Sequence, residues 1–339
     1  MPSSFDKLLH RVYLNNYRLA KTSFELESGL YYNVKQNKYS VLITGLARSG
    51  TTALLNNFHR TGIFASLSYR DMPFLLAPNL WGKKQFFWSS TRARLHDDNL
   101  LISSESPEAL DEFFWKVYTD PSYYNSAELP IQELDKCQID KYKEYINMVC
   151  NAYSKEFFVS KNNNSVLRLR SLVEYKVFNK VIVLFRNPLD HASSLLKLHK
   201  KFTNDQRNDG FILEYFNFLG HHEFGLNQKP FSLDPIVSDR LRKFDKFELN
   251  YWLLSWLNYY KYLSDNFLME LVFIDFTSVC MYPLEVMKQL LGDIPVSLTL
   301  EKIESYLPSK YPTLSCDIEI LNECLLVYEV LLSRAIKIK

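Results

Sequence analysis

The chain of 339 residues has no large excess of charge of either sign. Its 40 Lys and Arg residues nearly balance 38 Asp and Glu residues, and the formal net charge at pH 7 is +2. A general nucleic-acid-binding protein needs a strong basic excess, so this balance argues against nucleic acid as a partner. It leaves room for one local basic pocket that binds an anionic ligand.

Cysteine is also scarce, with five residues and no C-x-x-C pair. An odd number without close spacing predicts neither a disulfide framework nor a zinc site. Chains without disulfides are typical of reducing compartments, so we expect a cytoplasmic protein. The five residues are Cys137, Cys150, Cys280, Cys316 and Cys324.

Long apolar stretches are missing as well. Residues 1–14 contain Asp6, Lys7 and Arg11 and no apolar core of a signal peptide. No segment approaches the roughly 20 apolar residues that span a bilayer, so we expect no transmembrane segment. The longest apolar runs, such as residues 181–185, suit buried strands.

Aromatic residues, by contrast, make up 15% of the chain, with 22 Tyr and 24 Phe. Large aromatic side chains commonly build a core, and here some of them could also line a cleft for an acceptor molecule. Residues 5–19 place apolar side chains at helical spacing. This spacing predicts an amphipathic helix that packs on the domain or, alternatively, lies on a membrane surface.

Short apolar runs alternate with helical patterns along the chain. We expect strands at 38–45, 157–160, 181–185 and 271–274, and helices at 5–19, 50–60, 103–118, 140–154, 166–178, 187–201, 249–267, 283–291 and 318–336. Alternation implies parallel β-α-β units, and strands that are apolar at every position are buried on both faces. The pattern predicts one α/β domain, residues 1–339, with irregular insertions near 119–150 and 203–248.

Residues 106–108 carry signals for the start of the 103–118 helix. Ser106 can cap the helix, Pro107 suits the first helical position, and Glu108 faces the positive end of the helix dipole. Polar residues predict loops at 120–130 and 203–210, and two prolines predict irregular structure at 220–240.

Residues 41–52 form a strand, a turn and the start of a helix. Gly45 and Gly50 have the spacing of the two glycines in the G-x-x-x-x-G-K-[ST] phosphate loop. Glycines let the backbone approach an anion, and the helix start offers unpaired N–H groups. Thr51 stands where an NTP-hydrolysing loop has its Lys, and Arg48 supplies the fixed cation instead. We therefore expect a bound phosphate whose terminal group is not a γ-phosphoryl.

Residues 181–194 form a second strand, loop and helix. Arg186 follows the buried strand, at the edge where open α/β sheets bind ligands, and Ser194 lies within the helix. An Arg fork and a hydroxyl can bind a phosphate monoester. Two anion sites suit a nucleotide that is phosphorylated at both its 5′ and 3′ positions, which is the particular feature of 3′-phosphoadenosine-5′-phosphosulfate (PAPS).

In these motifs the sequence resembles the PAPS-dependent sulfotransferases. Residues 46–52 resemble their 5′-phosphosulfate loop, in the R-S-G-T-T form of the protein-tyrosine and carbohydrate branches. Residues 186–194 resemble their 3′-phosphate motif, and Lys161 resembles a Lys that precedes this motif in many bacterial members. The segment 271–283 resembles the later strand-turn-Pro segment.

The resemblance implies a three-layer P-loop-like α/β fold with a central parallel sheet flanked by helices, PAPS as the sulfuryl donor, and no metal. The cytosolic small-molecule branch has a Lys at position 48, which sets this chain apart from it. The residues expected to bind the donor are Arg48, Ser49, Gly50, Thr51, Thr52, Arg186 and Ser194. The segments 92–115 and 220–225 look characteristic of a bacterial subgroup.

Four residues are candidates for the chemistry. Arg48 would stabilise charge on the leaving phosphate. Lys161 is a second candidate cation near the sulfuryl group. In the protein-tyrosine branch, the general base is an acid some distance past the loop Arg, and Asp71 is the nearest matching carboxylate here. Asp71 could instead pair with Arg70 or cap a helix. His96, which has acidic neighbours, is the other candidate base.

Several alternatives remain open at the level of the sequence. His221, His222 and Glu223 could bind a metal by residue type, or bind the acceptor, or simply pack. The function most consistent with the motifs is sulfuryl transfer from PAPS to a hydroxyl of a small molecule or a glycan. A P-loop kinase or nucleotide hydrolase, and a non-catalytic nucleotide-binding module, are the competing hypotheses. No motif indicates an oligomeric state.

Overall fold

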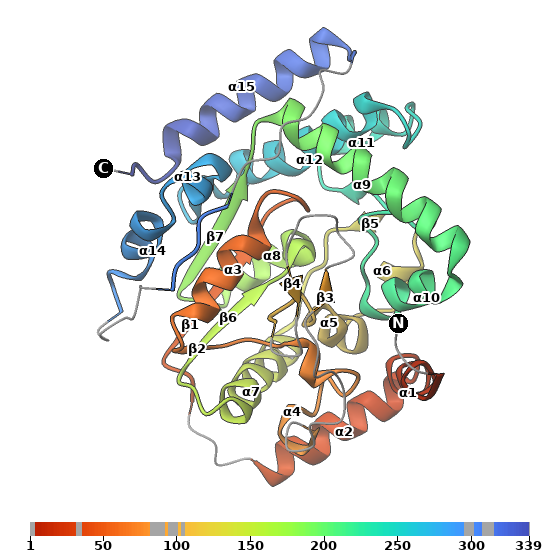
Figure 1. The fold of residues 1–339 in the computed structure, drawn as a ribbon, viewed down its shortest axis with the longest axis vertical. Coiled ribbons are helices and arrows are strands. Elements are labelled where there is room, and N and C mark those ends of the chain that lie inside the picture. The colour runs from red at the N-terminus through yellow and green to blue at the C-terminus, as the bar shows by residue number, and fades with distance from the viewer. Residues whose placement is uncertain are drawn as a thin grey trace.

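The structure is a computed structural model, and it describes residues 4–31, 36–81, 92–93, 101–102, 106–294, 302–306 and 315–338. Its centre is a five-stranded sheet in the order β2-β6-β1-β7-β9, in which every pairing is parallel (Figure 1). The strands are β1 (Tyr39–Thr44), β2 (Phe64–Ala65), β6 (Phe157–Lys161), β7 (Lys180–Phe185) and β9 (Val272–Asp275). The four strands expected from the sequence are confirmed, and the short β2 was not predicted.

Both faces of the sheet are buried, as its apolar strands predict. Successive residues of β1 face opposite sides, with Val41 and Ile43 in one hydrophobic cluster and Leu42 in the other. The first cluster packs under α3 (Thr51–Arg60) and α14 (Pro283–Leu291). The second packs under α7 (Lys136–Ala152), α8 (Leu169–Glu174), α9 (Pro188–Asn208) and α12 (Leu249–Phe267). The three-layer α/β architecture expected from the sequence is therefore confirmed.

The remaining elements surround this core. The helices are α1 (Ser4–Leu14), α2 (Tyr17–Leu30), α4 (Pro78–Trp81), α5 (Glu112–Tyr118), α6 (Ser122–Asn125), α10 (Gly210–Leu219), α11 (Pro235–Leu241), α13 (Phe276–Met281) and α15 (Ile318–Arg334). Two 3-10 helices are η1 (Tyr69–Asp71) and η2 (Asn163–Arg168). The short strand pairs are β3 (Arg92–Ala93) with β4 (Leu101–Ile102), and β5 (Leu129–Pro130) with β8 (Phe231–Ser232).

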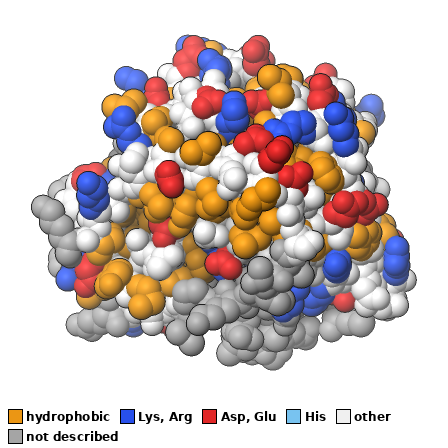
Figure 2. Space-filling view, turned by 90° about the horizontal axis from the view of Figure 1, so that it is seen from above, with side chains coloured by type: hydrophobic (Ala, Val, Ile, Leu, Met, Phe, Trp, Pro, Cys, Tyr) orange, Lys and Arg blue, Asp and Glu red, His pale blue; other side chains and the backbone are white. Residues whose placement is uncertain are grey.

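The helix α15 covers α12 at one end of the molecule (Figure 1). It buries Ile320, Cys324 and Leu331 and leaves Leu326 exposed. Figure 2, which looks down on this end, shows apolar side chains interspersed with acidic and basic ones. Among the described residues, no helix has both the length and the apolar character that crossing a bilayer requires.

Several expected elements are wrong in their bounds. The helix expected at 103–118 begins only at Glu112, because Pro107 instead forms a β-bridge with Ser68. The helix expected at 5–19 is two helices, because the side chain of Asn16 accepts the N–H of Leu19 and starts α2. Residues 106–108 are of types that often start helices, but in this fold they lie before α5 and do not cap it.

Segments expected to be loops contain helices. The expected loop 203–210 is wrong, because α9 continues to Asn208 and buries Phe202 and Gln206. The expected irregular stretches 120–130 and 220–240 contain α6 with β5, and β8 with α11. The division of the chain into one domain, residues 1–339 with insertions, stays a prediction.

Candidate functional site

The loop between β1 and α3 is tightly folded. Gly45 has φ +147° and Gly50 has φ +97°, and the non-glycine Arg48 also has a positive φ of +73°. A Cβ atom at Gly45 would lie 2.5 Å from the carbonyl oxygen of Leu184, and one at Gly50 would lie 2.5 Å from the ring of Phe276. Glycine is required at both positions because the backbone passes so close to neighbouring groups.

Side chains of α9 contact this loop. His191 Nε2 lies 2.7 Å from the carbonyl oxygen of Ala47, to which it donates, and Arg48 Nε donates to Ser194 Oγ at 3.3 Å. His191 is fully buried and Ser194 nearly so. Burial, with smaller contributions from the charges of Arg186 and Arg48, lowers the pKa of His191 to about 3. The hydrogen bond from Arg48 in the first motif to Ser194 in the second places the two motifs close together.

The aromatic helix α12 contacts both motifs at once. Tyr260 Oη accepts the N–H of Leu46 at 3.3 Å and donates to the carbonyl oxygen of Leu184 at 2.8 Å. One turn earlier, Trp256 Nε1 donates to the carbonyl oxygen of Arg186 at 3.1 Å. Sequence reasoning had expected aromatic side chains to form the core, and these do so while also binding the backbone of the site.

Arg186 follows β7, which pairs directly with β1. Its guanidinium lies 4.7 Å from the centre of the Phe276 ring, the same ring that packs against Gly50. Asn187 caps α9 by accepting the N–H groups of residues 189 and 190, and Pro188 is the first helical residue, as expected. The predicted second motif is therefore a strand, a capped helix start and a buried Ser194, at the same edge of the sheet as the first.

Lys161 ends β6, the other neighbour of β1, and is paired in register with Ile43. Its Nζ lies 3.5 Å from Oε1 of Glu108, and both side chains are buried. Tyr69 Oη donates to Oε2 of the same carboxylate at 3.3 Å. Sequence reasoning placed Glu108 in a helix start and missed this pairing, since only the fold brings Glu108 to the end of β6.

Buried charges anchor the strand end that carries Lys161. Asn162 Nδ2 donates to Glu112 Oε2 at 2.9 Å and to Asp111 Oδ1 at 3.2 Å. The fully buried Arg168 binds Glu112 with two nitrogens, and Ser160 Oγ donates to Asp111 at 2.5 Å. Burial raises the pKa of Asp111, and hydrogen bonds from Ser160 and Tyr142 oppose that shift.

The two candidate bases have different outcomes. Asp71 is fully buried and forms a capping box in η1, where its Oδ2 accepts the N–H of Ser68 at 2.8 Å and the hydroxyl of Tyr153 at 2.5 Å. Arg70 Nε lies 3.9 Å from its other oxygen. The structure thus gives Asp71 the capping and ion-pair contacts that the sequence offered as the alternative. His96 lies outside the described residues.

The segment from Gly220 to Glu223 lies against the same strand end. Asn164 Nδ2 donates to the carbonyl oxygen of Gly220 at 3.1 Å, and Asn163 Nδ2 donates to Glu223 Oε1 at 3.5 Å. Thr51 Oγ1 in turn lies 3.5 Å from Asn163 Oδ1. Asn163 thus connects Glu223 to the start of α3.

The histidines of this segment bind backbone carbonyls. His221 Nε2 lies 2.9 Å from the carbonyl oxygen of Ala109, and the buried His222 Nδ1 lies 3.3 Å from that of Asn227. Burial, with the charges of Lys229 and Lys116, lowers the pKa of His222 to about 3. Within the described ranges, no group of three His, Cys, Asp or Glu side chains is placed to bind a metal ion.

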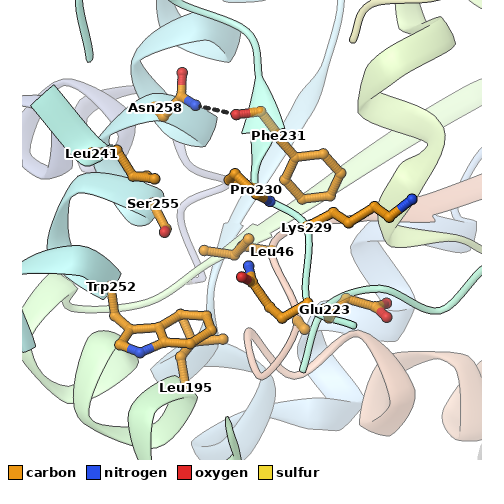
Figure 3. A pocket seen from close by; sticks show the side chains of 12 residues that line it. Leu46, Leu195, Glu223, Lys229, Pro230, Phe231, Leu241, Trp252, Ser255 and Asn258 are labelled. Atoms are coloured by element: carbon orange, nitrogen blue, oxygen red, sulfur yellow. Dashed lines mark hydrogen bonds between the residues drawn. The ribbon is translucent and has the colours of Figure 1, made fainter. Parts of the chain in front are cut away.

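A pocket lies beside the β1–α3 loop (Figure 3). Leu46 and Ala47 form part of its wall, and Trp252 and Ser255 of α12 another part. Figure 3 shows the Lys229 amine directed away from Leu46. The other lining residues are Leu195, Glu223, Gln228, Pro230, Phe231, Leu241 and Asn258. The pocket joins the loop to the segment that follows α10.

No family model matches the chain, and no curated protein matches it. Sulfotransferase STF9 from Mycobacterium avium superposes with a TM-score of 0.54 at 14% identity, covering 93% of this chain and 82% of its own. Sulfotransferase STF1 from Mycobacterium tuberculosis H37Rv gives 0.48 at 11% identity, covering 98% and 87%. The sulfotransferase domain from the curacin biosynthetic pathway gives 0.35 at 13% identity, covering 85% and 83%. The likeness to STF9 shows a shared P-loop-like α/β fold.

Proposed function

We propose that this chain is an enzyme that transfers a sulfuryl group from PAPS to a hydroxyl of a small-molecule or glycan acceptor. The observation that carries the proposal is the placement of Arg48 and Arg186 after the adjacent strands β1 and β7, with Arg48 hydrogen-bonded to Ser194 of the second motif. Cations that follow two neighbouring strands suit a nucleotide phosphorylated at both ends of its ribose. ATP has no 3′-phosphate for the second cation to bind.

The residues around the loop suit the 5′ end of such a nucleotide. Gly50 opens α3, whose first N–H groups lack helical partners and favour an anion. Arg48, Ser49, Thr51 and Thr52 would add a guanidinium and hydroxyls there. Arg186 and Ser194 would bind the 3′-phosphate. PAPS would supply an activated sulfuryl group and a phosphate leaving group.

The chain's own groups can then be given roles in the transfer. Arg48 would stabilise the charge that develops on the leaving phosphate, and such a group typically contributes about 10²–10³ in rate. Lys161, at the end of the strand beside β1, would orient the sulfuryl oxygens. We assign the general-base role to Glu108 rather than Asp71, because Glu108 contacts Lys161 whereas Asp71 is enclosed by its capping contacts. His96 stays a candidate from the sequence.

The test is sulfuryl transfer from labelled PAPS by the wild type and by Arg48→Ala and Arg186→Ala. We expect each variant to lose at least about 10²-fold in activity while keeping the circular-dichroism spectrum of the wild type. The matched control is Arg170→Ala, which removes an exposed Arg whose guanidinium contacts Asn266 away from both motifs. Wild-type activity in either site variant would remove that residue from the mechanism.

The acceptor follows from a second experiment with the same donor. Labelled PAPS and the purified protein would be incubated with an extract of host cells, and the labelled products identified. A magnesium-dependent release of phosphate from ATP, without transfer from PAPS, would support the kinase or hydrolase alternative. Binding of the nucleotide without any transfer would support a non-catalytic module. A cytoplasmic location stays a prediction.

A further inference from the structure

We infer that His191 is a positioning residue, which fixes the β1–α3 loop in its nucleotide-binding conformation from the helix that begins at the 3′-phosphate site. The inference rests on the proposed function, because it concerns the same two phosphate sites. His191 belongs to the first turn of α9, and its side chain contacts the loop between Gly45 and Gly50. Nothing in the spacing of the phosphate motifs gives this residue a role.

The contact controls one peptide plane. The carbonyl of Ala47 and the N–H of Arg48 belong to the same trans peptide, so the two groups point in opposite directions. His191 Nε2 holds the carbonyl at 2.7 Å from the interior side. The N–H of Arg48 therefore points away from His191. Loss of the donor would let this plane rotate and would change the direction of the N–H.

The backbone conformation of Arg48 is unfavourable unless neighbouring groups stabilise it. Arg48 has φ +73°, and residues with a Cβ adopt this left-handed region only where neighbouring groups stabilise it. Tyr260 binds the N–H of Leu46, and His191 binds the carbonyl of Ala47, the residue just before Arg48. The fully buried imidazole is thus among the side chains that bind the loop backbone just before the strained residue.

The protonation state suits a fixed hydrogen bond. Nε2 faces a carbonyl oxygen and must carry a proton, so the neutral ring has an acceptor at Nδ1. Burial, aided by the charges of Arg186 and Arg48, keeps the ring neutral at physiological pH. A neutral donor adds no charge to the site, so its effect on nucleotide binding comes through the position of the loop.

The experiment measures nucleotide affinity by calorimetry in His191→Ala, His191→Gln and His191→Asn. The probes are 3′-phosphoadenosine-5′-phosphate, adenosine 5′-monophosphate and adenosine 3′-monophosphate. Losing one buried hydrogen bond typically weakens binding about tenfold, and we expect that loss in His191→Ala for the two probes with a 5′-phosphate. The 3′-monophosphate should lose the least affinity in His191→Ala, because its phosphate would bind Arg186 and Ser194, which lie outside the loop.

Two amide variants separate positioning from general stability. The amide nitrogen of Gln reaches the place of Nε2, whereas that of Asn ends near Nδ1. We expect His191→Gln to restore most of the affinity and His191→Asn to resemble His191→Ala. His199→Ala is the matched control, since His199 is a buried histidine of the same helix whose Nδ1 accepts the N–H of Gly225, away from the loop. It should lower the melting temperature and leave all three affinities unchanged.

Each outcome decides a different question. If the wild type binds the bisphosphate but His191→Ala binds it equally well, the inference is wrong and the proposed function stands. If His191→Ala loses affinity for the 3′-monophosphate as much as for the 5′-monophosphate, the role of His191 is general stability and the inference is also wrong. If His191→Ala does not fold, equal affinities in the Gln and Asn variants would overturn it. A wild type that binds no bisphosphate would refute the proposed function itself.

Discussion

Neutral histidines lie on two sides of the candidate site. His191 contacts the loop, and His222 lies in the segment that packs against Asn163 and Asn164. Burial lowers the pKa of both rings to about 3. In the unfolded chain they titrate near the ordinary value of 6.5. Below that pH the unfolded chain binds more protons than the folded one, so acid lowers the free energy of unfolding.

His222→Gln tests this linkage. Because the pKa of His222 is lowered in the folded state, the residue adds to the free energy of unfolding. This stabilisation is complete above pH 6.5 and is lost as the pH falls towards 3. Between pH 7.5 and 5.5 the wild type should therefore lose about 1 kcal/mol more than the variant in free energy of unfolding. Urea unfolding at the two pH values measures the difference. Equal losses in the two proteins would contradict the neutral state of His222.

Some residues of the candidate site can be predicted from their sequence neighbours, and others cannot. Arg48 and Arg186 were predicted because each lies in a local strand-loop-helix motif with glycine or proline at fixed spacing. Glu108 and His191 were not, because their partners Lys161 and Ala47 are distant in the sequence. Spacing along the sequence favours Asp71 as the general base, and only the fold shows that its carboxylate caps η1; its catalytic role stays a prediction.

At the scale of elements, strands and long helices were predicted more accurately than their connections. The aromatic α12 and the proline-started α14 have the expected bounds, because apolar periodicity and a proline at the helix start are local signals. The start of α5 was wrong, because pairing of Pro107 with Ser68 outweighs its helix-start residues. The length of α9 was wrong, because Thr203 and Gln206 near its polar end are buried and Gln206 accepts the N–H of Leu226 beyond α10.

Replacement of Arg168 tests how η2 anchors the end of β6. Arg168→Met removes the cation that binds Glu112 and leaves two buried carboxylates, Asp111 and Glu112, without it. Breaking such a buried pair costs about 3–5 kcal/mol of unfolding free energy, which urea denaturation would measure. Replacing Glu112 by Met in the same protein should recover part of the loss. A loss as small as that of Arg240→Met, at the surface pair with Glu323, would show that the buried pair does not anchor this turn.

At the scale of the whole molecule, the sheet order brings distant segments to one edge. Lys161, the β1–α3 loop and Arg186 follow the three neighbouring strands β6, β1 and β7. A ligand that spans these strands should stabilise the entire fold, because it binds only the folded state. Free ligand at 100 times its Kd adds about 2.7 kcal/mol.

We therefore expect 3′-phosphoadenosine-5′-phosphate to raise the melting temperature more than ATP does at equal concentration. The reason is that ATP has no 3′-phosphate to bind Arg186 and Ser194. Differential scanning fluorimetry measures both shifts, and Arg186→Ala should remove most of the difference. Equal shifts with the two nucleotides in the wild type would refute a dedicated 3′-phosphate site.

The contacts of α12 also have a consequence for the order of events during synthesis. The ribosome completes the residues from 45 to 194, with the cations of both motifs, before it makes Trp256 and Tyr260. Those two side chains bind the backbone of both motifs. The nascent chain therefore contains the cations of both motifs before Trp256 and Tyr260 can bind and hold the backbone of those motifs. Under the proposed function, competence to bind nucleotide is therefore a late event, reached only after this helix has left the exit tunnel and packed.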